Sequence, residues 1–284
     1  MRIALGIAYD GRAYHGWQSQ LSGQTVQDKL EAALARFAGL AAGLRMPTLC
    51  AGRTDTGVHG LMQVVHFDTD IERTPFSWVR GTNRYLPDDI AVQWAQPVPD
   101  TFHCRASALT RRYRYVLSQS PVRPSVDAGR VGWTMRALDG DAMRTAAAML
   151  LGQHNFTSFR ASACQALSPV KHLRRLDIAK HSSVPGGSAN ASARDRDGAE
   201  IERCRWEFEF EADAFLHHMI RNILGCLVRV GQGDAPPTWM AEVLAARSRK
   251  VAAPTFSAAG LYFLGPLYAA AWGLPAEATL AAAA

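Results

Sequence analysis

Lysine is scarce in this sequence, the cysteines are unpaired and no long hydrophobic run occurs. Only four of the 31 Lys and Arg residues are lysine. The five cysteines are widely spaced and form no C-x-x-C pair, which argues against a disulfide framework or a zinc knuckle and favours a reducing compartment. No window approaches the roughly 18 unbroken apolar residues of a membrane span, and the N-terminus has no signal-peptide pattern. We therefore expect a cytoplasmic protein without a membrane partner.

Motifs for metal ions and nucleotide cofactors are also missing. The sequence contains no H-E-x-x-H helix and no H-x-E…P-C-x-x-C pattern, which disfavours metal-dependent hydrolysis and zinc-dependent deamination. It also has no glycine-rich nucleotide-binding fingerprint. The sequence therefore favours neither a metal site nor a nucleotide cofactor, and covalent or acid–base chemistry by a carboxylate remains.

What the sequence does contain is basic charge and ample apolar material. Lys plus Arg number 31 against 25 Asp plus Glu, which gives a net charge of +6 and a pI near 9.3. That balance favours a polyanionic partner, and arginine suits bidentate phosphate contacts. With 48% hydrophobic and 20% charged residues, the chain can fold as one large or two medium domains.

Apolar periodicity predicts strands and helices in both halves of the chain. The predicted strands cover residues 3–9, 47–50, 61–68, 111–117 and 204–210. The predicted helices start at the capping box Thr25–Asp28, run through Met143 to Leu150, and span Leu216 to Val230. Residues 182–198 have the composition of a solvated loop, and the alanine-rich tail after Gly273 is expected to fray.

The stretch AGRTDTGVHG, residues 51–60, falls between two predicted strands. Its glycines Gly52, Gly57 and Gly60 suit turns that need unusual backbone angles. Asp55 within it has three possible roles: a turn residue, a metal ligand with His59 or His66, or a working carboxylate. The missing metal motifs weaken the second role, and the residues alone do not decide between the first and the third.

Two further residues are candidates for chemistry. Tyr113, on the strand 111–117, is either a core residue or an aromatic platform for a flipped base, with a phenol able to transfer a proton. Arg221 falls on the polar side of the helix 216–230, with His218 and Asn222, and is either solvated or the permanent cation that keeps a buried carboxylate ionised. Four arginines around Tyr113 are expected to contact phosphates: Arg105, Arg111, Arg112 and Arg114.

Seven collinear motifs resemble those of the tRNA pseudouridine synthase A family, and together they cover nearly the whole chain. In order they read YDGRAYHGWQ, AGRTDTGVHG with QVVHF after it, GTNRYLPDDIAV, FHCRASALTRRYRY, LLGQHNFTSFR, FLHHMIRNILGCLVRVG and PTFSAAGLYF. One such motif is weak evidence, whereas seven in the same order and at the same spacing are highly specific.

The resemblance implies an isomerase that converts uridine to pseudouridine at positions 38, 39 and 40 of the tRNA anticodon stem-loop, without a cofactor. Asp55 matches the family's catalytic aspartate, Tyr113 its active-site tyrosine and Arg221 the arginine that pairs with the aspartate. Arg53 matches an arginine associated with base flipping. The first chemical step stays open: the aspartate attacks C1′ of the sugar, attacks C6 of the base, or removes the 2′ proton.

The resemblance also implies further tRNA contacts and a fold. Arg73 matches a second basic position that contacts tRNA, and two short segments match stretches that contact it. These are Phe102, His103, Cys104, Arg105 and Ala106, where the family commonly has alanine at Cys104, and Ala163, Cys164 and Gln165. The implied fold is α+β: two related α+β halves, residues 1–109 and 110–284, share a mostly antiparallel central sheet flanked by helices, with the active-site cleft between them. The implied assembly is a homodimer.

Two rival functions are compatible with the composition. A non-catalytic RNA-binding module would explain the charge and Tyr113 but not the loop around Asp55. A metal-dependent RNA-cleaving enzyme would need a metal ion. Loss of isomerisation without loss of tRNA binding in Asp55→Ala would exclude the first, and insensitivity to EDTA with intact product tRNA would exclude the second.

Overall fold

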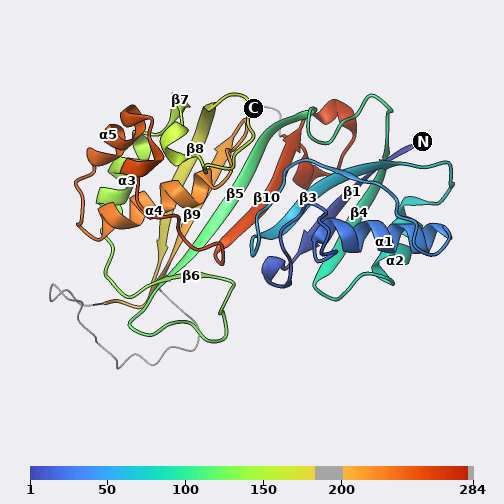
Figure 1. Ribbon diagram of the computed structural model, residues 1–284, viewed down its shortest axis with the longest axis horizontal. Coiled ribbons are helices and arrows are strands. Elements are labelled where there is room, and N and C mark those ends of the chain that lie inside the picture. The colour runs from blue at the N-terminus through green and yellow to red at the C-terminus, as the bar shows by residue number, and fades with distance from the viewer. Residues whose placement is uncertain (183–200, 281–284) are drawn as a thin grey trace. The chain divides into compact units, whose positions relative to one another are not determined.

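The computed structural model describes residues 1–182 and 201–280, which form two compact units (Figure 1). The first unit comprises Met1–Arg112 and the described residues from Tyr262 onward. The second comprises the described residues between Tyr113 and Leu261. This division differs from the contiguous halves 1–109 and 110–284 predicted from the sequence, because the last strand of the chain pairs with a strand of the first unit.

The sheet of the first unit contains β1 (Arg2–Tyr9), β3 (His59–Asp68), β4 (Ile90–Val98) and β10 (Leu261–Tyr268). Its order is β4-β1-β3-β10, and the short β2 (Leu49–Cys50) also pairs with β3. β1 runs antiparallel to both of its neighbours, whereas β10 runs parallel to β3 with Tyr262 opposite His59. The predicted strand 3–9 is confirmed, and its central place explains why successive residues of β1 are buried on both faces.

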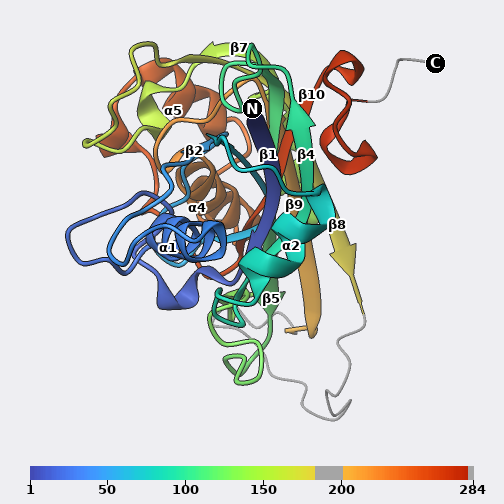
Figure 2. The ribbon, with the colours of Figure 1, turned by 90° about the vertical axis from the view of Figure 1, so that its right-hand side faces the viewer.

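Two helices cover one face of this sheet, α1 (Val26–Ala38) and α2 (Pro75–Asn83) (Figure 2). α1 begins at the predicted capping box, because the Thr25 hydroxyl accepts from the Asp28 amide at 3.2 Å. Trp78 of α2 is fully buried against Phe37 of α1, with ring centroids 5.3 Å apart. The helices are therefore fixed to each other as well as to the sheet.

The opposite face of the sheet is covered by the C-terminal segment of the chain. After β10 come two short 3-10 helices, η4 (Ala270–Trp272) and η5 (Ala276–Ala278). Ala278 is fully buried in a cluster with Phe102 and Tyr268, and the Leu280 amide donates to the Tyr268 carbonyl at 2.8 Å. The prediction that the chain frays after Gly273 is thus wrong for residues 274–280, because apolar burial orders this alanine-rich segment.

The strands of the second unit follow the order β5-β9-β8-β7, with β6 parallel to the end of β5. They are β5 (Ala108–Gln119), β6 (Gly132–Thr134), β7 (Gly152–Asn155), β8 (Val170–His181) and β9 (Cys204–Ala212). The alternation predicted for β9 is confirmed, since every second residue is buried. The predicted loop 182–198 lies, apart from residue 182, outside the described residues.

Three helices belong to the second unit: α3 (Gly140–Ala148), α4 (Met219–Gly231) and α5 (Trp239–Ala246), with the 3-10 turns η2 (Thr157–Phe159) and η3 (Arg249–Val251). α4 begins three residues later than predicted, because His218 adopts a left-handed backbone with φ 61°. Asn222 was predicted on the polar side but is fully buried; its amide donates to the Phe159 carbonyl at 2.8 Å and its oxygen accepts from Thr255 Oγ1 at 2.7 Å.

The predicted fold class is confirmed, since the strands pair mostly antiparallel and helices flank them. All five cysteines carry free thiols. Among the described residues, no helix combines the length and the apolar character needed to cross a bilayer.

Candidate active site

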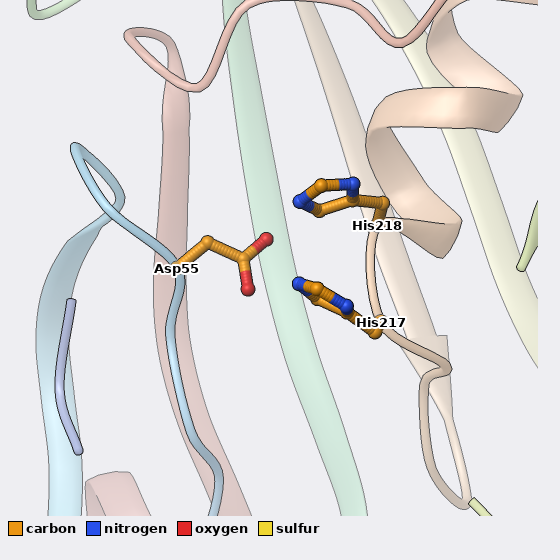
Figure 3. A group of neighbouring side chains, drawn as sticks. All are labelled: Asp55, His217 and His218. Carbon is orange, nitrogen blue, oxygen red and sulfur yellow. The ribbon is translucent and has the colours of Figure 1, made fainter. Parts of the chain in front are cut away.

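Asp55 lies in the loop that joins β2 to β3, with its carboxylate half-buried (Figure 3). The backbone on either side of it is held at several points. The Trp17 amide donates to the Thr54 carbonyl at 3.0 Å, and the Thr54 hydroxyl is hydrogen-bonded to the Tyr9 hydroxyl at 2.7 Å. The Val58 amide donates to the carbonyl of Asp55 itself at 3.1 Å. The carboxylate therefore projects from a fixed backbone.

Two glycines allow this loop to pack so closely. Gly57 has φ 77°, in the left-handed region that side chains disfavour. Gly16, from the segment after β1, has φ 86°, and a Cβ there would lie 2.7 Å from the Thr54 carbonyl oxygen. The sequence predicted turns at Gly52 and Gly60 too, but Gly60 lies within β3, where its lack of a side chain leaves room for the Tyr9 ring.

Gln63 holds the start of the loop and was not identified from the sequence. Its side chain is fully buried; Nε2 donates to the Gly52 carbonyl and Oε1 accepts from the Gly52 amide at 3.3 Å. Such a pair of hydrogen bonds mimics a strand pairing and fixes the loop where it leaves β2. A polar residue that falls on the buried face of an apolar strand was the only signal for this role.

The sequence offered His59 and His66 as ligands of a metal ion shared with Asp55, but both rings have other partners. The His59 ring stacks on Tyr262 with centroids 4.7 Å apart, and its Nδ1 lies 3.2 Å from Asp10 Oδ1. Burial opposes ionisation of Asp10, but the hydrogen bonds of Arg12 and the nearby His59 lower its pKa to about 2. His66 accepts from the Cys104 amide at 3.3 Å, and burial lowers its pKa to about 4. Both rings therefore support the fold around the loop.

Arg53 and Arg73, the two expected tRNA contacts in this unit, are exposed. Neither forms an ion pair with any residue that the structure describes. The Arg73 guanidinium lies over the Phe37 ring at 5.9 Å from its centroid. Both charges are thus available to a polyanion.

The segment Phe102–Ala106 is divided between core and surface. Phe102 and Cys104 are fully buried, Phe102 against Tyr268 and Trp272. Cys104 Sγ donates to the Leu49 carbonyl at 3.2 Å. Direct side-chain contact with RNA at these two positions is excluded, and His103, Arg105 and Ala106 are the positions that reach the surface.

Tyr113 and Arg221 belong to the second unit. Tyr113 is 9% exposed and meets the Phe215 ring edge to face at 5.2 Å. Arg221 lies on the first turn of α4, where its Nε donates to the Phe256 carbonyl at 2.8 Å and its own carbonyl accepts from the Phe256 amide at 3.1 Å. One hydrogen bond orients the guanidinium group and the other joins the two backbones.

The rings of His217 and His218 lie against each other directly before α4, with centroids 4.0 Å apart and planes inclined by 44° (Figure 3). The left-handed backbone of His218 is one of two such conformations outside glycine among the described residues. Strain of this kind concentrates at functional sites. Sequence reasoning placed His218 on the helix, because periodicity does not reveal a left-handed residue at a helix start.

The segment Ala163–Gln165 lies in a loop that Arg160 holds together. The Arg160 guanidinium donates to the Cys164 carbonyl at 2.5 Å and to the Ala166 carbonyl at 3.0 Å. Burial opposes ionisation of the Cys164 thiol, but backbone amides and the Arg160 charge lower its pKa overall. Ala163 and Gln165 are exposed beside it.

Three of the four arginines expected to contact phosphates near Tyr113 have partners within the protein. Arg114 forms an ion pair with Glu209 at 2.6 Å, and Arg112 donates to the Glu277 carbonyl at 3.2 Å. Arg111 donates to three carbonyls, those of Ala51, Arg105 and Ala108. Arg105 is exposed, whereas Arg111, Arg112 and Arg114 are partly buried, so Arg105 is the most accessible of the four to a phosphate.

Comparison with known proteins identifies the family. A family model described as tRNA pseudouridine synthase matches residues 6–105 and 146–269. The chain is 72% identical over 282 residues to tRNA pseudouridine synthase A of Variovorax paradoxus, covering 99% of this chain and 97% of the relative. Identity to tRNA pseudouridine synthase A of Paracidovorax citrulli is 68% over 277 residues, covering 97% and 96%.

Among solved structures, a crystal structure of a Cbf5-Nop10-Gar1 complex aligns with 80% of this chain and 45% of that chain, at 11% identity and a TM-score of 0.33. A similarity at that level does not establish a shared fold. The sequence relatives and the family model agree over nearly the full length. The chain belongs to the tRNA pseudouridine synthase A family of isomerases, which convert uridine to pseudouridine in tRNA.

Proposed function

We propose that this enzyme isomerises uridine at positions 38, 39 and 40 of the tRNA anticodon stem-loop, with Asp55 as the catalytic carboxylate. The net reaction breaks the bond between C1′ and N1 and forms a bond between C1′ and C5. The C5 proton is lost and N1 gains a proton, so no oxidant, reductant or activated leaving group is needed. A nucleophile or base at the junction of sugar and base is sufficient.

The observation that carries this proposal is the fixed loop around Asp55. An aspartate can close a turn through its own side chain. Here the turn is already made by Gly57 and by the hydrogen bonds of Trp17, Tyr9 and Gln63. Such a loop holds in place the backbone that carries the carboxylate, which favours a positioned nucleophile or base.

Arg221 and Tyr113 are proposed to act with Asp55 on the same nucleotide. A permanently charged guanidinium, oriented by Phe256, would keep the carboxylate ionised when substrate excludes water. Tyr113 would stack on the uracil and relay the proton lost from C5. Arg53 would fill the space left by the flipped base, since flipping a paired base costs a few kcal/mol.

Asp55→Asn, compared with Asp70→Asn, tests the catalytic role. Both changes remove one carboxylate charge from the first unit, and Asp70 is exposed. We expect Asp55→Asn to retain tRNA binding and to lose pseudouridine formation by at least three orders of magnitude, whereas Asp70→Asn keeps both. The readouts are tRNA binding and release of tritium from tRNA labelled at C5 of uridine. Retained isomerisation in Asp55→Asn would overturn the assignment.

A second measurement separates isomerisation from metal-dependent cleavage. The tRNA is folded in monovalent salt, and the reaction is run with and without EDTA. We expect equal pseudouridine formation in both and product tRNA of unchanged length on a denaturing gel.

The target positions are tested by mapping pseudouridine in tRNA from cells that lack the gene. We expect pseudouridine at positions 38, 39 and 40 to be lost.

We also propose that the enzyme is a cytoplasmic homodimer. The family resemblance implies the dimer, which suits a tRNA that contacts both subunits, and the widely spaced cysteines favour a reducing compartment. Sedimentation of the purified protein with and without tRNA tests the dimer. A monomer that retains full activity would contradict this part while leaving the catalytic assignment intact.

A further inference from the structure

Four exposed arginines lie on the outer layer formed by α1 and α2, where Figures 1 and 2 both show the two helices side by side. Arg36 is in the last turn of α1, and Arg73, Arg80 and Arg84 lie before, within and directly after α2. Arg80 and Arg84 are four residues apart, which places them on the same side of the helix. We call these four residues the α1–α2 arginine surface.

Aromatic rings support three of these four guanidinium groups. The Arg36 guanidinium lies 4.5 Å from the centroid of the Tyr85 ring, Arg73 lies 5.9 Å from Phe37, and Arg80 lies 5.6 Å from Phe76. Contact with a ring limits the motion of an arginine without neutralising its charge. Two of these contacts, Arg36 with Tyr85 and Arg73 with Phe37, connect the end of α1 to the two ends of α2, whereas Arg80 and Phe76 both lie within α2.

The charges of the α1–α2 arginine surface are not compensated by carboxylates. In the described part of the chain, none of the four arginines forms an ion pair within 4 Å; even Glu72, the neighbour of Arg73 in sequence, makes none with it. Arg45 differs, since it pairs with the buried Asp28 of α1. Arginines that only solubilise a surface commonly pair with neighbouring acidic residues, whereas these four make no such pair among the described residues.

The layer that carries these arginines is rigid. Phe37 packs into α2, where a Cβ on Gly81 would lie only 1.9 Å from its ring, and Phe37 also meets the buried Trp78 edge to face. The spacing of the four charges is therefore set by the fold. Several unpaired arginines on one packed layer suit a polyanionic ligand, such as a nucleic-acid backbone.

We infer that the α1–α2 arginine surface binds the ribose–phosphate backbone of the tRNA, away from the nucleotide that reacts. This inference rests on the proposed function, because it takes tRNA as the substrate. The family resemblance implies a contact only for Arg73; Arg36, Arg80 and Arg84 extend the contact beyond it. Phe76, which is 67% exposed next to Arg80, adds an aromatic surface to the same region.

A second copy of this chain is the other partner that an exposed Phe76 suggests, but the charges oppose it. A two-fold contact through this surface would place the same patch on both copies opposite each other. Eight uncompensated guanidinium groups would then face one another across the contact, in a protein whose net charge is already +6. The charge pattern thus favours an anionic partner.

The test is the salt dependence of tRNA binding by the full-length triple variant Arg36→Gln, Arg80→Gln, Arg84→Gln. Affinity for a nucleic acid falls as salt rises, and on a duplex each lost phosphate contact makes the plot of log affinity against log salt less steep by about 0.9. We expect the steepness of the plot to fall by about 2 to 3. The ratio of wild-type to variant affinity should then shrink roughly 40-fold between 50 and 200 mM salt. The kcat at saturating tRNA should be unchanged, because no substituted residue belongs to the Asp55 loop.

The matched control is Arg144→Gln, Arg175→Gln, Lys180→Gln, which removes the same charge from residues that are in ion pairs with Asp141, Asp177 and Glu202. It should keep the wild-type slope.

An unchanged slope in the Arg36, Arg80 and Arg84 variant would overturn the inference. If its sedimentation changed while its slope did not, the surface would instead be assigned to contacts between copies of the chain. A wild-type protein that binds tRNA but forms no pseudouridine would refute the proposed function instead. The salt slopes would then still test whether the α1–α2 arginine surface contacts tRNA.

Discussion

At the scale of single residues, the left-handed backbone of His218 links the geometry of α4 to the candidate site. A side chain in this region costs roughly 1 to 2 kcal/mol, which glycine avoids. The His217 carbonyl accepts from the Ala161 amide at 3.0 Å and the His218 carbonyl from the Asn222 amide at 2.9 Å. Hydrogen bonds on both sides keep the backbone in this conformation. They therefore determine where α4 begins and where its first turn places Arg221.

We expect His218→Gly to be more stable than His218→Ala by about 1 kcal/mol in urea denaturation. Both variants lose the imidazole, so their difference isolates the backbone strain. If pseudouridine formation falls equally in both, the side chain has its own role in the reaction; recovery in His218→Gly alone would show that only the backbone conformation matters. Equal stability of the two variants would contradict the strain argument.

Asp55 stands out in the sequence because a charged side chain between closely spaced glycines departs from an ordinary turn, although only the collinear family motifs favour a catalytic role over a turn residue. Gln63 and Asn222 could not be found in this way. The partner of Gln63 is eleven residues away, and Asn222 meets Phe159 and Thr255, which are 63 and 33 residues away. Their burial depends on tertiary contacts, which local periodicity does not record.

At the scale of elements, the N-terminus of α1 depends on one buried carboxylate. Burial opposes ionisation of Asp28, but hydrogen bonds from Ser19, Thr25 and Arg45 lower its pKa to about 2, against 3.8 for a free side chain. A pKa lowered on folding stabilises the protein above the unfolded pKa. That stabilisation disappears as the pH falls through the folded pKa.

Asp28→Asn should therefore lower the free energy of unfolding by about 2 kcal/mol at pH 7 and by about half as much at pH 3. Urea denaturation across this range measures the difference, with the exposed Asp70→Asn as the control that should show little change at any pH. A difference between Asp28→Asn and wild type that is the same at pH 7 and pH 3 would show that the ionised carboxylate contributes no stability.

Elements with strong local signals were predicted well. The capping box at Thr25 and the alternation on β9 depend on neighbouring residues, and both are confirmed. The start of α4 was predicted three residues too early, because Leu216 fits the apolar stripe and only the backbone of His218 excludes it from the helix. The ordering of residues 274–280 was missed, since it depends on contacts with Tyr268 and Phe102.

At the scale of the whole molecule, the chain leaves the first unit after Arg112 and returns to it at Tyr262. The sequence predicted two α+β units but not this return, because parallel pairing of β10 with β3 joins residues about two hundred positions apart. Phe263 of β10 is fully buried in the first unit, and Phe208 of β9 is fully buried in the second. These two residues offer a matched pair for testing how the chain is divided.

We expect Phe263→Ala and Phe208→Ala each to destabilise the protein by about 3 kcal/mol or more, through lost burial and the cavity left behind. Hydrogen exchange followed by mass spectrometry then locates the effect. Phe263→Ala should speed exchange in β1 and β4 while β8 keeps its protection. Phe208→Ala should speed exchange in β8 while β1 and β4 keep theirs, because local opening follows cooperative units. Faster exchange in β8 on substitution of Phe263 would favour the contiguous halves 1–109 and 110–284 over the division seen in the structure.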